Sequence, residues 1–264
     1  MYSFDYQRPT DRAAAAAAAT GDARFLAGGQ SLVQAMKLRL ASAEKLIDLG
    51  AIADLKGIKV DAGSVTIGAM TTHAAVAASA DVKKAIPALA ELAAGIGDLS
   101  VRNMGTIGGS IAHADPAACY PAAIVGLGAT VHTNKRTIAG DQFFTGLFST
   151  ALQPGELITA VQFPIPQKAA YIKDKQPASR FALVGVFVRQ GSGGVRVGVT
   201  GCKSNAYRES ALEAALAKSF TPEAAKAVKV GEAGINADLH GSAAYRAAMI
   251  SVMAARAVAA ANSR

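Results

Sequence analysis

The chain has 264 residues, of which 51% are hydrophobic and 17% are charged, and its formal net charge at pH 7 is +8. This composition excludes disorder for most of the chain, because it can bury enough apolar surface to offset the entropy lost on ordering. The length exceeds that of most single domains. The two cysteines, Cys119 and Cys202, are too few for a disulfide framework or for an iron–sulfur cluster of the chain's own.

The distribution of basic residues and of apolar stretches argues against two further classes, nucleic-acid-binding proteins and secreted or membrane-spanning proteins. Basic residues occur singly or in pairs, without interleaved aromatic residues, so we expect no nucleic-acid binding. The segment 1–12 is charged and lacks the apolar run of a secretory signal, and the apolar stretch 120–131 is broken by Pro121 and two glycines. We therefore expect a cytoplasmic protein without a membrane span.

The first predicted unit, residues 1–54, is a small α/β lobe. Thr10 and Asp11 are good helix caps before an alanine-rich run. A strand, a glycine pair and a helix with apolar residues at helical spacing follow. The predicted strands are 2–9, 24–27 and 46–49, and the predicted helices are 13–19 and 31–40.

The second predicted unit, residues 55–166, alternates strands and helices and ends at Pro164 and Pro166. A proline near its middle, Pro87, is expected to interrupt a helical region. The predicted strands are 58–60, 65–69, 130–133 and 157–163; helices are predicted at 73–79 and 81–98, a helix or loop at 116–124, and a phenylalanine-rich loop at 143–148.

The third predicted unit, residues 167–264, combines an antiparallel hairpin with helices. The strands 181–189 and 195–201 are joined by Gly191-Ser192-Gly193-Gly194, which is a strong hairpin signal. Helices are predicted at about 208–218, 222–229 and 241–261. The whole chain is therefore predicted to be an α+β protein.

Catalytic motifs carried by protein side chains are missing from the sequence. The four histidines are scattered, and neither a zinc-binding HExxH motif nor a nucleophile elbow is present. The chain has no Walker A motif and no GxGxxG after a strand. We predict no catalytic residue and no metal site.

Two glycine-pair motifs stand out instead. Ala27-Gly28-Gly29-Gln30-Ser31-Leu32 lies between a strand and a helix, where N–H groups at a helix start suit anionic oxygens. The segment 105–110, Gly-Thr-Ile-Gly-Gly-Ser, offers N–H groups and two hydroxyls. Each motif alone is equally consistent with a tight turn. Together, in successive lobes, they predict one diphosphate held from both sides, as in a dinucleotide bound outside the Rossmann scheme.

The residues around both motifs carry a family resemblance. Ala27–Leu40 and Val101–Ala118 resemble the two FAD-binding signatures of the medium, flavoprotein subunit of molybdenum hydroxylases of the xanthine dehydrogenase and carbon monoxide dehydrogenase type. The resemblance extends over the chain, through the opening strand, residues 182–201 and Asp238–Arg246. It implies a two-lobed FAD-binding domain of the PCMH type, as in vanillyl-alcohol oxidase-like flavoproteins, followed by an α+β C-terminal domain with an antiparallel sheet and helices.

The resemblance also implies a function. This chain would hold FAD, while a large subunit holds a molybdenum pterin cofactor and a small subunit holds two [2Fe–2S] clusters, in a dimer of heterotrimers. Electrons would arrive from the clusters and leave from the flavin to an external acceptor. The short chain with two cysteines resembles the carbon monoxide dehydrogenase type more than relatives with an extra [4Fe–4S] cluster.

The resemblance assigns cofactor contacts to particular residues. On one side of the diphosphate it places Ala27, Gly28, Gly29, Gln30, Ser31 and Leu32, and on the other side Thr106, Gly108, Gly109 and Ser110. Asp115, Ile158 and Lys173 would lie near the flavin.

Several of these assignments have alternatives. Asp115 is equally suited to capping a helix begun at Pro116. Leu157 could take the place of Ile158, and either could be ordinary core. Lys175 competes with Lys173.

Three further residues around the motifs need a role. Arg102 and Asn103 could orient the second motif or cap a helix end. Cys119 stands where relatives often carry a carboxylate that could accept a sugar hydroxyl, and a thiol is a weaker acceptor.

Two other functions stay open at this point. One is a self-contained FAD oxidoreductase of the same fold superfamily, and the other is a nucleotide-binding subunit without catalytic activity. The small number of histidine, tyrosine and arginine clusters in the third unit argues against the first, and the intact glycine pairs argue against the second.

Overall fold

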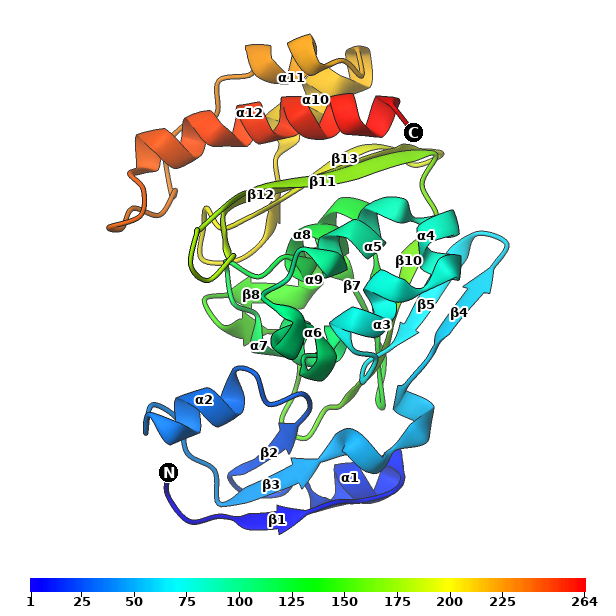
Figure 1. The fold of residues 1–264 in the computed structure, drawn as a ribbon, viewed down its shortest axis with the longest axis vertical. Coiled ribbons are helices and arrows are strands. Elements are labelled where there is room, and N and C mark those ends of the chain that lie inside the picture. The colour runs from blue at the N-terminus through cyan, green and yellow to red at the C-terminus, as the bar shows by residue number, and fades with distance from the viewer.

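The computed structural model describes residues 1–264, and its first lobe lies at one end of an elongated molecule (Figure 1). Three parallel strands in the order β1-β3-β2 form its sheet. The Asp11 carboxylate accepts the N–H of Ala14 and so caps the first helix, as predicted. The elements are β1 (Asp5–Gln7), α1 (Arg12–Ala18), β2 (Ala23–Leu26), α2 (Leu32–Lys37) and β3 (Lys45–Asp48), followed by two 3-10 turns at Leu49–Ala51 and Ala53–Leu55.

The second lobe is built on an antiparallel sheet of five strands in the order β4-β5-β10-β6-β7. Its helices pack in front of this sheet in Figure 1. The strands are β4 (Ile58–Asp61), β5 (Ser64–Gly68), β6 (Thr130–Thr133), β7 (Thr137–Ala139) and β10 (Ile158–Pro164), with a small hairpin of β8 (Phe144–Gly146) and β9 (Ser149–Thr150). The helices are α3 (His73–Ala78), α4 (Ala80–Ala85), α5 (Pro87–Ala94), α6 (Leu99–Met104), α7 (Ile107–His113), α8 (Tyr120–Leu127) and α9 (Gly140–Phe143).

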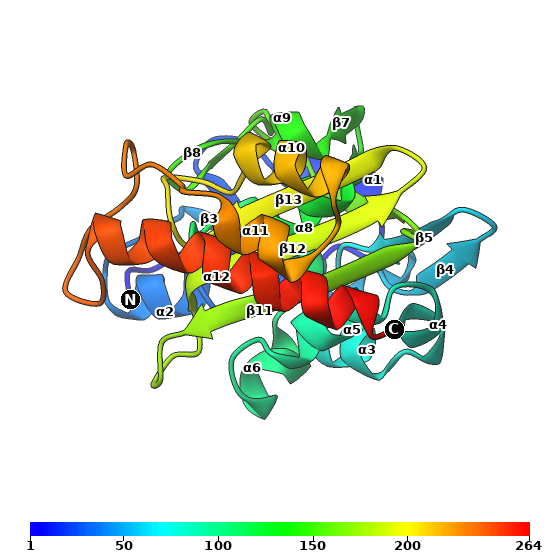
Figure 2. The same cartoon turned by 90° about the horizontal axis from the view of Figure 1, so that it is seen from above.

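The third unit is an antiparallel sheet of four strands covered by helices. Its strands are β11 (Lys168–Lys175), β12 (Ala182–Gly191), β13 (Gly194–Thr200) and β14 (Tyr207–Arg208), and its helices are α10 (Ser210–Lys218), α11 (Pro222–Ala227) and α12 (Ala243–Asn262). Figure 2 shows α12 lying across this sheet, while α8 of the second lobe packs on the opposite face. The largest core cluster therefore continues from the second lobe into Tyr171 and Phe187 of the third unit.

Helix α12 is the one helix long and apolar enough to cross a bilayer. Its apolar side chains, including Ile250, Met253 and Val258, are buried in the core between α12 and the sheet of the third unit. Core helices of water-soluble proteins commonly have this length and composition.

The three sheets lie within the predicted ranges 1–54, 55–166 and 167–264, although the domain boundaries themselves remain a prediction. The hairpin β12–β13 and the break before α5 were predicted correctly. Helix α6 and strands β7 and β11 were not predicted, and the expected loop 143–148 contains the end of α9 and part of the β8–β9 hairpin. The region 116–124 begins as a turn, and its helix starts only at Tyr120.

Candidate functional site

The two glycine motifs, residues 27–32 and 105–110, are far apart in the sequence and meet between the first two lobes. A Cβ on Gly28 would overlap the carbonyl oxygen of Met104 and lie 2.7 Å from the Cα of Gly105. A Cβ on Gly109 would lie 3.2 Å from the side chain of Ala27. The missing side chains therefore allow the two backbones to touch, and this contact joins the lobes at one place.

The first motif presents a row of unused donors. The backbone N–H groups of residues 28–32 donate to no acceptor within the protein, and the only internal side-chain bond is from Gln30 Nε2 to Gly28 O at 3.2 Å. Gly29 has a positive φ of 70°, which reverses the chain between β2 and α2. Consecutive free N–H groups in such a turn are suited to the oxygens of an anion.

The second motif differs from its expected form. Gly108, Gly109 and Ser110 lie in the first turn of α7 and not in a loop. Its N–H groups are already used: Ile107 donates to Thr71 O, Gly108 to Ala69 O, and Gly109 to the Thr106 hydroxyl. The expectation of free N–H groups at these three residues was wrong, because the start of α7 is hydrogen-bonded to the segment that follows β5 and to its own cap residue, Thr106. The hydroxyl of Ser110 makes no hydrogen bond and is a free polar group of this motif, together with the backbone N–H of Thr106.

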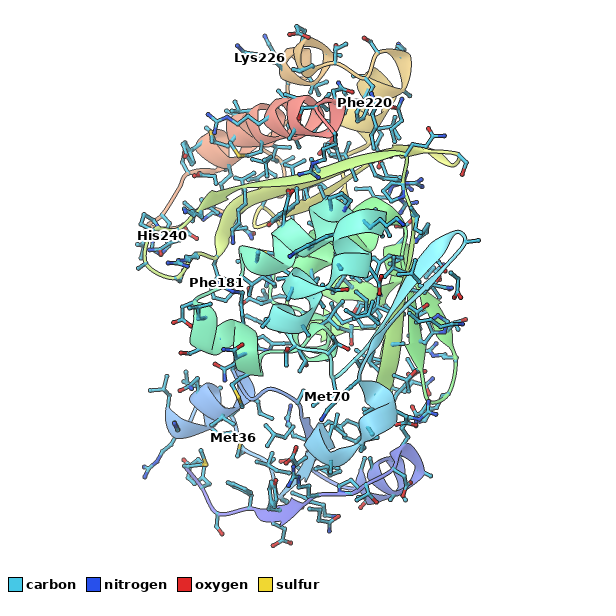
Figure 3. The ribbon with its side chains drawn as sticks, turned by 45° about the vertical axis from the view of Figure 1, so that its right-hand side comes forward. Met36, Met70, Phe181, Phe220, Lys226 and His240 are labelled. Atoms are coloured by element: carbon cyan, nitrogen blue, oxygen red, sulfur yellow. The ribbon has the colours of Figure 1, made fainter.

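Beyond α7 lies a cavity of about 500 Å³ between the second and third units. Asp115 lies at its wall and also accepts the N–H of Ala117 at 2.8 Å, so it caps the turn at 116–118 and not a helix. Figure 3 places Phe181 and His240 on the same side of the molecule, and both line this cavity. The lining residues are Asp115, Pro116, Ala117, Leu147, Phe148, Gln176, Ala178, Ser179, Phe181, Ala182, Leu183, Gly201, Asn236, Asp238, His240 and Arg246.

Ile158 and Leu157 lie away from this cavity. Ile158 belongs to the large core of the second lobe and is 4% exposed, and Leu157 is 3% exposed in the core beside the first lobe. Both side chains therefore pack in cores, and a contact of Ile158 or Leu157 with the flavin stays a prediction.

Lys173 and Lys175 differ sharply in their surroundings. Lys173 is half-buried, and its ammonium donates to Gly95 O at 2.9 Å and to Arg180 O at 2.6 Å, with Cys119 Sγ at 3.4 Å. Lys175 is exposed at the end of β11. Lys173 therefore holds together three segments, and Lys175 has no such contact.

Two arginines bind backbone carbonyls next to the one at Gly95 that Lys173 binds. The Arg102 guanidinium donates to Ile96 O and Gly97 O, and the Arg180 guanidinium donates to Gly97 O. Three cations thus meet the carbonyls that follow the C-terminus of α5, where the helix dipole favours positive charge. Arg102 has the capping role, for α5 and not for its own helix, and Asn103 is exposed without a hydrogen bond.

Sequence reasoning missed most of the cavity wall. Phe148 has a positive φ of 50° and packs against His113, with ring centroids 5.1 Å apart and the ring planes tilted by 41°. Arg246, 3% exposed, donates to both oxygens of Asp238 and to the carbonyls of Leu183 and Gly201. The Asp238–Arg246 signature was the available signal for this pair, and nothing in the local sequence pointed to Phe148.

His73 packs against Gly105, at the start of the second motif, and so supports the junction between the lobes. Its backbone N–H donates to Gly105 O, and its imidazole packs so closely that a Cβ on Gly105 would lie 2.6 Å from Nε2. Nδ1 is buried without a hydrogen bond, and the ring lies 5.4 Å from that of Tyr120. Burial, and then the nearby Arg102 charge, lower the pKa of His73 from 6.5 to about 4.

This buried histidine predicts a loss of stability in mild acid. In the unfolded chain His73 binds a proton near pH 6.5, whereas in the folded chain its pKa is about 4. We therefore expect the free energy of unfolding to be highest above pH 6.5 and to fall by up to about 3 kcal/mol as the pH drops toward 4. Urea unfolding at pH values across this window measures the fall, and His73→Gln should flatten it. An equal slope in the variant would assign the effect to other groups.

The geometry fits a nucleotide cofactor, and comparisons with known proteins agree. Residues 2–166 match the family described as "FAD binding domain in molybdopterin dehydrogenase". The carbon monoxide dehydrogenase medium chain of Afipia carboxidovorans is 42% identical over 190 residues, which are 68% of this chain and 66% of that one. The corresponding medium chain of Hydrogenophaga pseudoflava is 37% identical over 213 residues, which are 76% of this chain and 74% of that one.

Solved structures show the same architecture over the full length. Reconstituted CO dehydrogenase from Oligotropha carboxidovorans contains a chain with a TM-score of 0.90 and 36% identity, covering 100% of this chain and 99% of that one. A chain of quinoline 2-oxidoreductase from Pseudomonas putida 86 gives a TM-score of 0.89 at 28% identity, covering 99% of this chain and 98% of that one. These matches confirm the predicted PCMH-type FAD-binding fold with an α+β C-terminal unit. The chain therefore belongs to the family of FAD-binding subunits of molybdopterin dehydrogenases, the family of the carbon monoxide dehydrogenase medium chain.

Proposed function

We propose that this chain is the FAD-carrying electron-transfer subunit of a heteromeric molybdenum hydroxylase. It would accept electrons from the [2Fe–2S] clusters of a small subunit, while a large subunit carrying the molybdenum pterin cofactor oxidises the substrate. An assembly as a dimer of heterotrimers and a cytoplasmic location belong to this proposal. The observation that carries it is the row of free N–H groups at residues 28–32, held against the second motif.

The residues present fit FAD. The free N–H groups of the first motif would hold the diphosphate, with Gly109 and the Ser110 hydroxyl closing the opposite side. The cavity beside Asp115 would take the ring system, between residues 115–117 and the β11–β12 turn. When bound, FAD supplies the ability to exchange one or two electrons, and the protein supplies its position and surroundings.

The cavity wall favours electron transfer over acid–base catalysis by the protein. Among its titratable side chains, Asp115 caps a turn, and Asp238 is paired with the buried Arg246. His240 is the one remaining group, and it is exposed. A self-contained oxidoreductase would need more proton-transferring groups over the flavin than this wall offers.

Cofactor content tests the proposal directly. We expect the chain, purified alone or with its partners, to show flavin absorbance and to release FAD, and not FMN, on denaturation, because the diphosphate is the part held by the first motif. Co-purified partner subunits should add iron–sulfur absorbance. A colourless chain that takes up no FAD on reconstitution would contradict the proposal.

A further inference from the structure

A second cavity, of about 780 Å³, lies at the junction of the second and third units and plays no part in the proposed function. We call it the linker cavity, because residues 165–167, which connect β10 to β11, form part of its wall. The start of β11 lines the linker cavity, whereas Gln176, just after the end of β11, lines the candidate flavin cavity. The eight residues of β11 span about 20 Å at the rise of a β-strand. The linker cavity is therefore a separate space, and its volume suits a small ligand.

Apolar side chains form much of the wall of the linker cavity. They include Val60 of β4, Ile165 of the linker, and Ile86 and Pro87 at the boundary between α4 and α5. Val60 is 40% exposed, although its side chain is large and apolar. A ligand with an apolar body would remove this surface from water, which favours binding.

Two lysines that line the linker cavity have no carboxylate partner. The Lys84 ammonium, at the end of α4, makes no hydrogen bond and no ion pair. The half-buried Lys168 makes one side-chain hydrogen bond, from its ammonium to Asn262 Oδ1 at 2.7 Å. Asp81 is the one acidic residue of the wall, and it forms no ion pair. The two ammonium groups can therefore bind an anionic group of a ligand.

Arg264, the third basic residue of the wall, is already neutralised. Its guanidinium donates to Ala169 O at 2.9 Å and pairs with the Glu91 carboxylate on α5. Figure 2 shows the C-terminus of the chain beside α5, where this pair connects α5 to β11. The two lysines and Asp81 then leave one positive charge in excess. One excess charge matches a carboxylate better than a phosphate monoester, which carries up to about two negative charges.

We propose that the linker cavity binds a small apolar carboxylic acid in its ionised form. The apolar body of this acid lies against Val60, Ile86 and Ile165. Its carboxylate accepts hydrogen bonds from the ammonium groups of Lys84 and Lys168, and charge-assisted bonds of this kind orient the ligand. The bound acid contacts the second lobe, the linker and the third unit, so it holds these parts of the chain together.

Three probe molecules separate the two parts of this recognition. Octanoate has an apolar chain and a carboxylate, whereas octan-1-ol lacks the charge and acetate lacks the apolar chain. In calorimetric titrations of the full chain, we expect one octanoate to bind per chain, at least about ten-fold more tightly than either other probe. Equal affinity for octanoate and octan-1-ol would overturn the role of the lysines, and equal affinity for octanoate and acetate would overturn the role of the apolar wall.

Substitutions locate the binding site on the chain. Lys84→Met and Lys168→Met should each weaken octanoate binding at least about five-fold and change octan-1-ol binding little. Lys83→Met is the matched control, because Lys83 is next to Lys84 on α4 but does not line the cavity, and it should leave octanoate binding unchanged. Ala62→Phe, in the turn between β4 and β5, should fill the cavity and abolish octanoate binding. Ala62 is exposed, so the larger side chain needs no room in the core.

Unchanged octanoate affinity in both lysine variants, or octanoate binding retained by Ala62→Phe, would overturn the proposal. Thermal unfolding of each variant without ligand confirms that it folds. Flavin absorbance is followed in the same samples, and octanoate should leave it unchanged because the two cavities are separate. Release of flavin by octanoate would place the probe in the cofactor site and also overturn the proposal. Octanoate binding does not require FAD, so the proposal can fail while the proposed function stands, and the reverse.

Discussion

The Gly28→Ala substitution is expected to abolish retention of FAD by the purified chain. The added methyl group would overlap the carbonyl oxygen of Met104 and come within 2.7 Å of the Cα of Gly105. Both neighbours are backbone atoms at the end of α6, so they cannot turn aside as a flexible side chain could. The two motifs must separate, and the N–H groups of residues 28–32 then no longer face Gly109. We expect FAD affinity to fall at least about ten-fold, and the free energy of unfolding to fall by about 1–3 kcal/mol from overpacking.

Flavin absorbance per protein and thermal unfolding with and without FAD measure the two effects. Gly63→Ala, in the turn between β4 and β5, is the matched control, because a Cβ there meets nothing within 4 Å. Gly29→Ala should give an intermediate result, since it combines a positive φ of 70° with a contact of 3.0 Å to the Val33 side chain. If Gly28→Ala bound FAD as tightly as Gly63→Ala, the diphosphate would not lie at this junction.

Replacing Arg246 by methionine is expected to cause the largest loss of stability among single changes in the third unit. Arg246 is 3% exposed, and its guanidinium bonds both oxygens of Asp238 and the carbonyls of Leu183 and Gly201. Methionine leaves those two carbonyls without their donor and frees the loop that contains Asp238. We expect the free energy of unfolding to fall by about 2–4 kcal/mol.

Arg256→Met is the control for this change, because Arg256 lies on the same helix, is exposed and forms no hydrogen bond. Its effect should stay within about 0.5 kcal/mol. Asp238→Asn should cost less than Arg246→Met, since the Asp238 side chain is 48% exposed and water can replace part of the lost pairing. Chemical denaturation of the three variants side by side measures these differences. Equal losses for Arg246→Met and Arg256→Met would show that the buried network does not stabilise the fold.

The local elements were predictable where short-range chemistry decides them. Asp11 caps α1, Pro87 begins α5, and the glycine turn at 191–194 joins β12 to β13, and each of these depends on residues a few positions apart. Helix α6 was harder, because none of its six residues is buried, so it lacks the apolar periodicity that identifies a helix. Strand β11 carries four charged residues among its eight and was not recognisable without its partner β12.

The same distinction holds for the candidate site: features set by neighbouring residues were predictable, and features set by distant residues were not. The free N–H groups of the first glycine motif were predicted correctly from the sequence, because they follow from a glycine turn before a helix, and anion binding by this turn stays a prediction. The use of the second motif's N–H groups was not predictable, since the acceptors Thr71 O and Ala69 O come from the segment after β5, more than thirty residues away on the chain. For Ile158, the sequence predicts a strand in either case, so it does not show whether the side chain faces the core or a cofactor.

By itself, the sequence indicated which family the chain resembles, and it predicted that two glycine motifs hold the cofactor and that the chain has too few cysteines for an iron–sulfur cluster of its own. These conclusions depend on residue types and short spacings. Only the tertiary structure decided which donors are free, that Lys173 and not Lys175 is anchored, and that Cys119 lies beside an ammonium without a carboxylate partner. The physical reason is that hydrogen bonds and charges act over a few ångströms in space, and folding alone determines which distant residues come that close.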